Sequence, residues 1–158
     1  MLPDWVNAVP TASGLTSPDG DRSRNIDLVH RISADKYEFV ELKISSNNPL
    51  MAAMELLQYF LIFVFAQRTF HSLAHQPTLL NAQQVHLRVL APQPFYDGYD
   101  LRWLERELQQ GVVEVTKDDG IVVDFAFLAF PVDFKSPCAD HLLEDAMARR
   151  SAPRWRIL

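Results

Sequence analysis

Three polar residues interrupt two short apolar segments in the first third of the chain. Asp27 lies in the segment that begins at Ile26, and Glu41 and Lys43 lie two residues apart in the next one. Side chains alternate between the faces of a strand, so Glu41 and Lys43 point the same way, with alpha carbons roughly 6.6 Å apart. Carboxylates are the hard oxygen ligands that a divalent cation prefers. A lysine beside a metal-bound water supplies charge or takes part in proton transfer.

A hairpin must position these residues. The β-branched and aromatic residues of 26–32 and 37–44 predict two strands joined by a turn. Asp27 shares a face with Glu41 only if the two residues pair directly, which requires a three-residue loop at 33–35 or a bulge. A two-residue turn would pair Asp27 with Leu42 and turn its side chain to the opposite face.

A long apolar helix follows the hairpin. Asn48 is the expected N-cap and Pro49 the first helical residue, and the helix should reach about residue 71. Because nearly all of its residues are apolar, we expect burial on most sides. Glu55 and Gln58 share one helix face. They either support the site or form ordinary hydrogen bonds at a helix edge.

This order of an acid, a hairpin, a Glu-x-Lys and a polar-faced helix resembles the core of the PD-(D/E)xK nuclease superfamily, over roughly residues 20–130. The resemblance implies an α/β fold with a restriction-endonuclease-like mixed β-sheet flanked by helices. It also implies that Asp27, Glu41 and the backbone carbonyl of Leu42 hold Mg²⁺ or Mn²⁺. Lys43 would orient or activate the attacking water.

The next helix of RecB-like members carries a glutamine and a tyrosine, and Gln58 resembles that glutamine as a supporting catalytic contact. The family's tyrosine falls one turn later, where this chain has Ile62, so Tyr59 takes no role from the resemblance.

The expected function is therefore metal-dependent hydrolysis of phosphodiester bonds in nucleic acid, with DNA as the expected substrate. One alternative is a catalytically inactive module of the same fold that serves as a subunit or interaction domain. Another is an unrelated α/β domain in which Glu41 and Lys43 face solvent.

Composition sets further bounds. The 158 residues suit one domain, with an irregular segment at 1–25, a core at 26–130, and a C-terminal helix and basic tail at 136–158. The formal net charge of −5 argues against a surface that coats nucleic acid non-specifically, though not against local basic patches. A single cysteine, Cys138, excludes an internal disulfide and fits a reducing cytoplasm.

The N-terminus lacks the pattern of a signal peptide. The apolar run at 50–66 is shorter than the ~20 residues that span a bilayer. We therefore expect a cytoplasmic protein without a membrane segment, and the sequence leaves a homo-oligomer or a protein partner open.

The second half predicts a strand at 84–90, a helix at 101–110 ended by Gly111, and a hairpin of 112–116 with 121–130. Asp124 within the last strand should be paired. A final helix should run from residue 136 to about 150. The basic tract at its end, Arg149, Arg150, Arg154 and Arg156, is either solvated or contacts a nucleic-acid backbone or an acidic partner.

Overall fold

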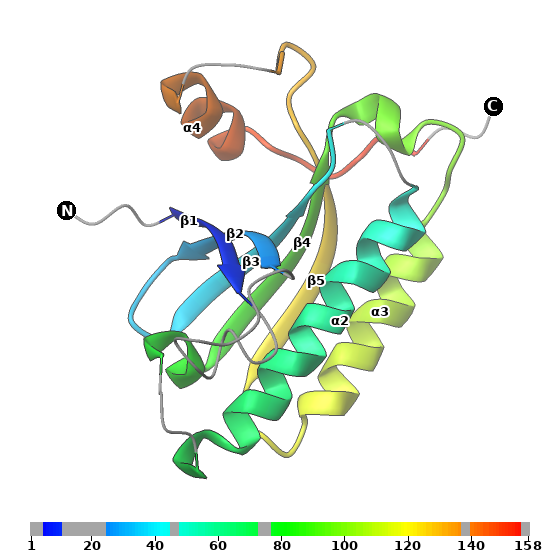
Figure 1. Ribbon diagram of the computed structural model, residues 1–158. Helices are drawn as coiled ribbons and strands as arrows, with labels where there is room; N and C mark the ends of the chain where they lie inside the picture. Colours follow the sequence, from blue (N-terminus) through cyan, green and yellow to red (C-terminus); the bar gives the residue numbers. More distant parts are fainter. Residues whose placement is uncertain (1–4, 11–24, 45–47, 73–76, 137–139, 156–158) are drawn as a thin grey trace.

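One five-stranded sheet organises the part of the chain that the computed structural model describes, residues 5–10, 25–44, 48–72, 77–136 and 140–155 (Figure 1). Strand β2 runs antiparallel to both β1 and β3, whereas β3, β4 and β5 run parallel to one another. In sequence and spatial order they are β1 (Trp5–Pro10), β2 (Asn25–Arg31), β3 (Lys36–Leu42), β4 (Gln84–Ala91) and β5 (Val122–Ala129). The predicted α/β class with a mixed sheet is confirmed. Most of the loop expected at 10–25 lies outside the described residues. Cys138 also lies outside them.

Helices cover both faces of this sheet. Helices α2 (Pro49–Arg68) and α3 (Arg102–Thr116) lie side by side on one face, and α4 (Asp140–Ala148) lies on the other (Figure 1). Short 3-10 turns occupy Phe70–Ser72, Thr78–Asn81 and Gln93–Tyr96. The larger core, between the sheet and α2 and α3, includes Phe39, Phe60, Phe63, Leu87 and Phe127. The smaller core beneath α4 contains Val40, Leu90, Phe130, Ala146 and Met147.

The hairpin of β2 and β3 has the register that the candidate site requires. Pairing runs from Leu28 with Val40 to Arg31 with Tyr37, and the backbone N–H groups of residues 32 and 33 donate to the Lys36 carbonyl at 2.9 and 3.1 Å. The loop therefore has three residues, 33–35. This register places Asp27 opposite Glu41, so the expected face is confirmed.

Helix α2 begins as the sequence predicts but is buried less than expected. The Asn48 side chain accepts a hydrogen bond from the Met51 N–H at 2.9 Å, with Pro49 in the first turn. By length and composition, α2 is the one helix among the described residues that could cross a membrane, with a mean hydropathy of 1.8. Its inner face packs on the sheet, yet only 44% of the most apolar stretch of the helix is buried. The expectation of burial on most sides is wrong, because the sheet covers one face only.

The predicted end of the next helix at Gly111 is wrong, and so is the second hairpin. Helix α3 runs through Gly111, because its apolar stripe continues at Val112 and Thr116, both of which are buried. A turn at 117–120, with Gly120 at φ +70°, then leads into β5. Strand β5 lies parallel to β4, so α3 is the crossover that the parallel pair requires.

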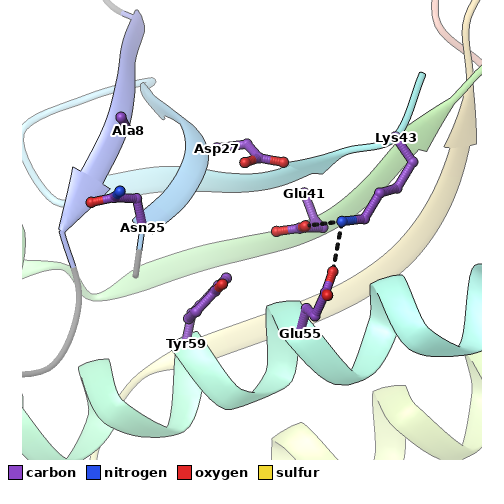
Figure 2. A pocket seen from close by; sticks show the side chains of 7 residues that line it. All are labelled: Ala8, Asn25, Asp27, Glu41, Lys43, Glu55 and Tyr59. Atoms are coloured by element: carbon purple, nitrogen blue, oxygen red, sulfur yellow. Dashed lines mark ion pairs between the residues drawn. The ribbon is translucent and has the colours of Figure 1, made fainter. Parts of the chain in front are cut away.

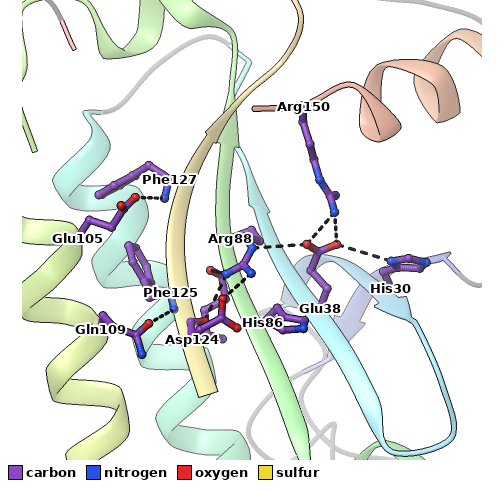
Figure 3. A network of polar contacts seen from close by, with 11 residues as sticks. His30, Glu38, His86, Arg88, Glu105, Gln109, Asp124, Phe125, Phe127 and Arg150 are labelled. Carbon is purple, nitrogen blue, oxygen red and sulfur yellow. Dashed lines mark hydrogen bonds and ion pairs between the residues drawn. The ribbon is translucent and has the colours of Figure 1, made fainter. Parts of the chain in front are cut away.

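Polar side chains of α3 take the place of the missing hairpin partner along β5. Glu105 and Gln109 accept hydrogen bonds from the backbone N–H groups of Phe127 and Phe125 at 2.8 and 2.7 Å (Figure 3). The Gln109 amide also donates to the Val123 carbonyl at 3.2 Å. These contacts cover an edge strand that would otherwise be open to pairing with another chain.

A polar network ties the C-terminal segment to the other face of the sheet (Figure 3). The buried carboxylate of Glu38 accepts two hydrogen bonds from Arg150, at 2.7 and 2.8 Å. Arg88 contacts Glu38 and bonds Asp124 at 2.6 Å, and His86 also contacts Asp124. The prediction that Asp124 is paired is confirmed.

The expected basic tail is thus partly used within the chain. Arg150 belongs to the network, and Arg149 pairs with Asp133 and Asp145.

We predict that Gly111→Ala raises the free energy of unfolding by about 0.5–1 kcal/mol, since alanine is favoured over glycine inside a helix. Apart from the adjacent residues and the backbone of α3, no atom of the described residues lies within 4 Å of the added methyl group. Urea denaturation measures the change. In the matched control, Gly120→Ala should destabilise the protein because residue 120 has a left-handed backbone. Destabilisation by Gly111→Ala would show that α3 ends where the sequence alone predicts.

We further predict that Arg150→Ala lowers the free energy of unfolding by about 2–3 kcal/mol, because it removes charged hydrogen bonds from the buried Glu38. Arg149→Ala is the matched control: its ion pairs are exposed, so thermal and urea denaturation should show little change. Equal effects of the two variants would contradict this account of the network.

Candidate functional site

A polar pocket of about 400 Å³ opens at the carboxyl end of β3, on the α2 side of the sheet (Figure 2). Ligands often bind at the carboxyl ends of parallel strands. Asp27, Glu41 and Lys43, the three principal residues predicted from the sequence, all line it. The full lining is Ala8, Asn25, Asp27, Glu41, Lys43, Glu55 and Tyr59.

Strand β3 delivers an acid and a base to this pocket. Its odd-numbered side chains face α2, and those of Tyr37 and Phe39 are buried in the core. Glu41 continues this row and is only 3% exposed. Lys43 reaches back, so that its Nζ lies 2.7 Å from Glu41 Oε1 and 2.6 Å from Glu55 Oε2 on α2 (Figure 2).

Asp27 enters the pocket at a local interruption of the pairing between β1 and β2. Ala8 of β1 has a φ of +50°, in the left-handed region, and pairing between β1 and β2 lapses at Ala8 and Asp27. Such a backbone costs roughly 1–2 kcal/mol for a residue with a side chain. The Asp27 side chain accepts a hydrogen bond through Oδ2 from the Leu42 N–H at 2.8 Å.

The same contact orients the Leu42 carbonyl. The N–H and C=O groups of one strand residue point toward the same side of the strand. Because the Leu42 N–H meets Asp27, the Leu42 carbonyl also faces the β2 side. The two carboxylates and this carbonyl, the three predicted metal ligands, therefore lie in one region.

The electrostatics of the pocket assign different charge states to Glu41 and Lys43. Burial raises the pKa of Glu41 to about 7; hydrogen bonding by Lys43 opposes this increase, and the negative charge of Asp27 adds to it. Burial lowers the pKa of Lys43, but hydrogen bonds to Glu41 and Glu55 outweigh burial and raise the pKa above its ordinary value. Lys43 is therefore a cation at neutral pH, whereas Glu41 is partly protonated.

Sequence reasoning missed three lining residues. Tyr59 lies one turn after Glu55, and burial together with the nearby carboxylates raises the pKa of its phenol, which stays neutral and able to donate. The i, i+4 spacing from Glu55 was the available signal. Asn25 and Ala8 carried no such signal, because neither residue type indicates a strand distortion.

The structure does not bring Gln58 to the pocket. Successive residues of a helix are rotated by about 100°, so residues 58 and 59 diverge from Glu55 in opposite directions. The sheet lies on the side of Tyr59, which lines the pocket, and Gln58 is exposed on the outer face of α2.

One observation tests whether the pocket suits a cation. Glu41 Oε2 is buried and has no hydrogen-bond partner among the described residues. A buried oxygen of this kind calls for an explanation such as a bound ion. No three His, Cys, Asp or Glu side chains in the described ranges gather in metal-binding geometry. The oxygen donors that the pocket does offer are two carboxylates and a backbone carbonyl, which are the kind of ligand that Mg²⁺ accepts.

No family model, curated protein or solved structure matches this chain.

We predict that the metal-free protein loses stability as pH rises from about 4.5 to about 7. The folded state binds the Glu41 proton more tightly than the unfolded chain, so ionisation in this range favours unfolding. Glu41→Gln removes this dependence. The stability difference between the variant and the wild type should shift by roughly 3 kcal/mol in favour of the variant across this range. Urea denaturation with a chelator present measures it, and parallel pH profiles would contradict the prediction.

Proposed function

We propose that this protein is a Mg²⁺- or Mn²⁺-dependent nuclease that hydrolyses phosphodiester bonds. The observation that carries the proposal is the convergence of Asp27, Glu41 and Lys43 from two neighbouring strands on one open pocket. Nothing in their spacing along the sequence requires this convergence, because a hairpin loop one residue shorter would have turned Asp27 away.

Asp27, Glu41 and the Leu42 carbonyl would hold the cation. When bound there, the cation would polarise a phosphoryl oxygen and lower the pKa of a water. Asp27 is held in place by its hydrogen bond from the Leu42 backbone, so its position does not depend on the ion.

Lys43 would act as a fixed positive charge. Its raised pKa makes it a poor proton acceptor at neutral pH, so of the two roles expected from the sequence, orienting the water or phosphate fits better than proton abstraction. Glu55 holds the ammonium group from the α2 side. The neutral phenol of Tyr59 would donate a hydrogen bond to an anionic oxygen.

Charge balance also favours a cation in the pocket. Asp27, Glu41 and Glu55 supply three carboxyl groups against the single ammonium of Lys43. This excess of negative charge repels a phosphodiester, and a divalent ion would offset it.

The mixed sheet and the order of hairpin, helix and parallel strand support the finer part of the proposal, a restriction-endonuclease-like fold of the PD-(D/E)xK type. DNA is the expected substrate, and RNA is the direct comparison.

We predict that Lys43→Met lowers metal-dependent cleavage by about 10²–10³-fold, since it removes a preorganised charge from the reacting phosphate. Fluorescently labelled single- and double-stranded DNA and RNA, with Mg²⁺ or Mn²⁺, measure the rate. Lys117→Met is the matched control, because Lys117 forms a similar ion pair with Glu114 on the exposed face of α3. Unchanged cleavage by Lys43→Met would refute the assignment.

A second candidate function is a catalytically inactive subunit or interaction module. It is favoured by the two ion pairs of Lys43, which satisfy its ammonium group without a substrate. Calorimetry with Mn²⁺ separates the candidates: the nuclease must bind the ion and lose affinity in Asp27→Asn, whereas the inactive module binds none.

A further inference from the structure

The outer face of α2 exposes several large apolar side chains. Met51, Met54, Leu61 and Phe65 are each between 42% and 68% exposed, and Gln58 lies among them. Their positions, 51, 54, 58, 61 and 65, follow alternating intervals of three and four residues. That is the spacing by which one helix packs along another. These five residues form the outer stripe of α2.

The outer stripe lies opposite the buried face of α2. Ala53, Leu56, Phe60 and Phe63 point into the core from the other side of the helix. Helix α2 is therefore apolar all round, a pattern found in helices that are covered on all sides. The sheet covers only one side of α2.

The exposed area matches one half of an ordinary interface. Together with Leu50, which is 48% exposed, the apolar residues of the stripe present roughly 500 Å². This is at the upper end of what a typical monomer exposes in one patch. A standard interface takes about 800 Å² per partner, of which somewhat more than half is apolar.

The stripe is centred on Gln58. Met51 and Phe65 lie seven residues to either side, and Met54 and Leu61 lie four residues before it and three after it. A two-fold axis through Gln58 would place like surfaces against each other, as an isologous dimer requires. The glutamine amide both donates and accepts, so two copies of Gln58 would satisfy one another.

A lipid surface fits the stripe less well. It would leave the Gln58 amide without a partner in an apolar medium. Helices that lie on membranes also carry a cationic rim. Here the exposed charges of the neighbouring α3 and of the turn that follows it are balanced. They are the cations Arg102, Arg106 and Lys117 and the anions Glu107, Glu114 and Asp118.

We infer that the protein forms a homodimer in which α2 packs against α2 of a second copy, with the two helices crossing at Gln58. Glu55 and Tyr59 face the pocket rather than the stripe, so the inference does not rest on the proposed nuclease activity. The stripe contains none of the residues that line the pocket.

Sedimentation velocity of the full chain over a concentration series tests the inference. The wild type should approach twice the chain mass of 18.1 kDa as concentration rises. Leu61→Glu and Phe65→Glu should each raise the dissociation constant by about 30-fold or more, the loss expected at an interface hot spot. Both residues are exposed in the single chain, and circular dichroism verifies folding. Val132→Glu is the matched control, because Val132 is 82% exposed in the segment after β5 and should leave the dimer unchanged.

Cross-linking gives an independent readout. In a Cys138→Ser background, Gln58→Cys should form an intermolecular disulfide under mild oxidation, and Val132→Cys should not, since a disulfide needs alpha carbons within about 7 Å. A monomer at all concentrations would overturn the inference. So would a dimer indifferent to Phe65→Glu, or a monomer that sediments with anionic phospholipid vesicles through the same stripe.

Discussion

A buried carboxylate at the end of β3 is the constraint around which the pocket is built. Glu41 continues a row of aromatic core residues, so its charge is desolvated, and Asp27 approaches it from β2. Two carboxylates in such a place repel each other, and the repulsion is relieved when one takes up a proton or when a cation lies beside them. Lys43 supplies one positive charge and is itself shared with Glu55. One ammonium cannot neutralise three carboxyl groups, and this imbalance is the physical basis for proposing a divalent ion.

The backbone contributes as much as the charges. The three-residue loop at 33–35 fixes the register that turns Asp27 toward the pocket, and the pairing of β1 with β2 is interrupted at the left-handed Ala8 and Asp27. The Leu42 N–H holds the Asp27 carboxylate, and strand geometry places the Leu42 carbonyl on the same side. Strain in a strand that coincides with a polar pocket is typical of functional sites.

Sequence reasoning succeeded where local patterns decide the structure. The hairpin, the cap at Asn48, the strand of β4 and the shared face of Glu41 and Lys43 all follow from alternation, capping and turn chemistry. It failed where tertiary context decides. Most of residues 112–116 are β-branched, which suggests a strand. In the structure Val112 and Thr116 are buried one helical turn apart, and α3 continues through Gly111. The choice between Gln58 and Tyr59 depended on which side of α2 meets the sheet, which no local pattern states.

The two faces of α2 divide its roles. The edge next to the sheet presents Glu55 and Tyr59 to the pocket, and the opposite stripe is apolar and free for another copy. Gln58, which the sequence analysis expected to support catalysis, belongs to that second surface. The inferred dimer would account for the composition of α2, which is apolar enough for a membrane span, by a second contact between copies in addition to the one within the chain.

The most direct test of the central claim is the number of protons released when Mn²⁺ binds, obtained by calorimetry in buffers of different ionisation enthalpy. With the pKa of Glu41 near 7, binding at about pH 6.5 should expel roughly three-quarters of a proton. Glu41→Gln should release none. Binding without proton release by the wild type, or no binding at all, would contradict the claim that Glu41 and Asp27 share one cation.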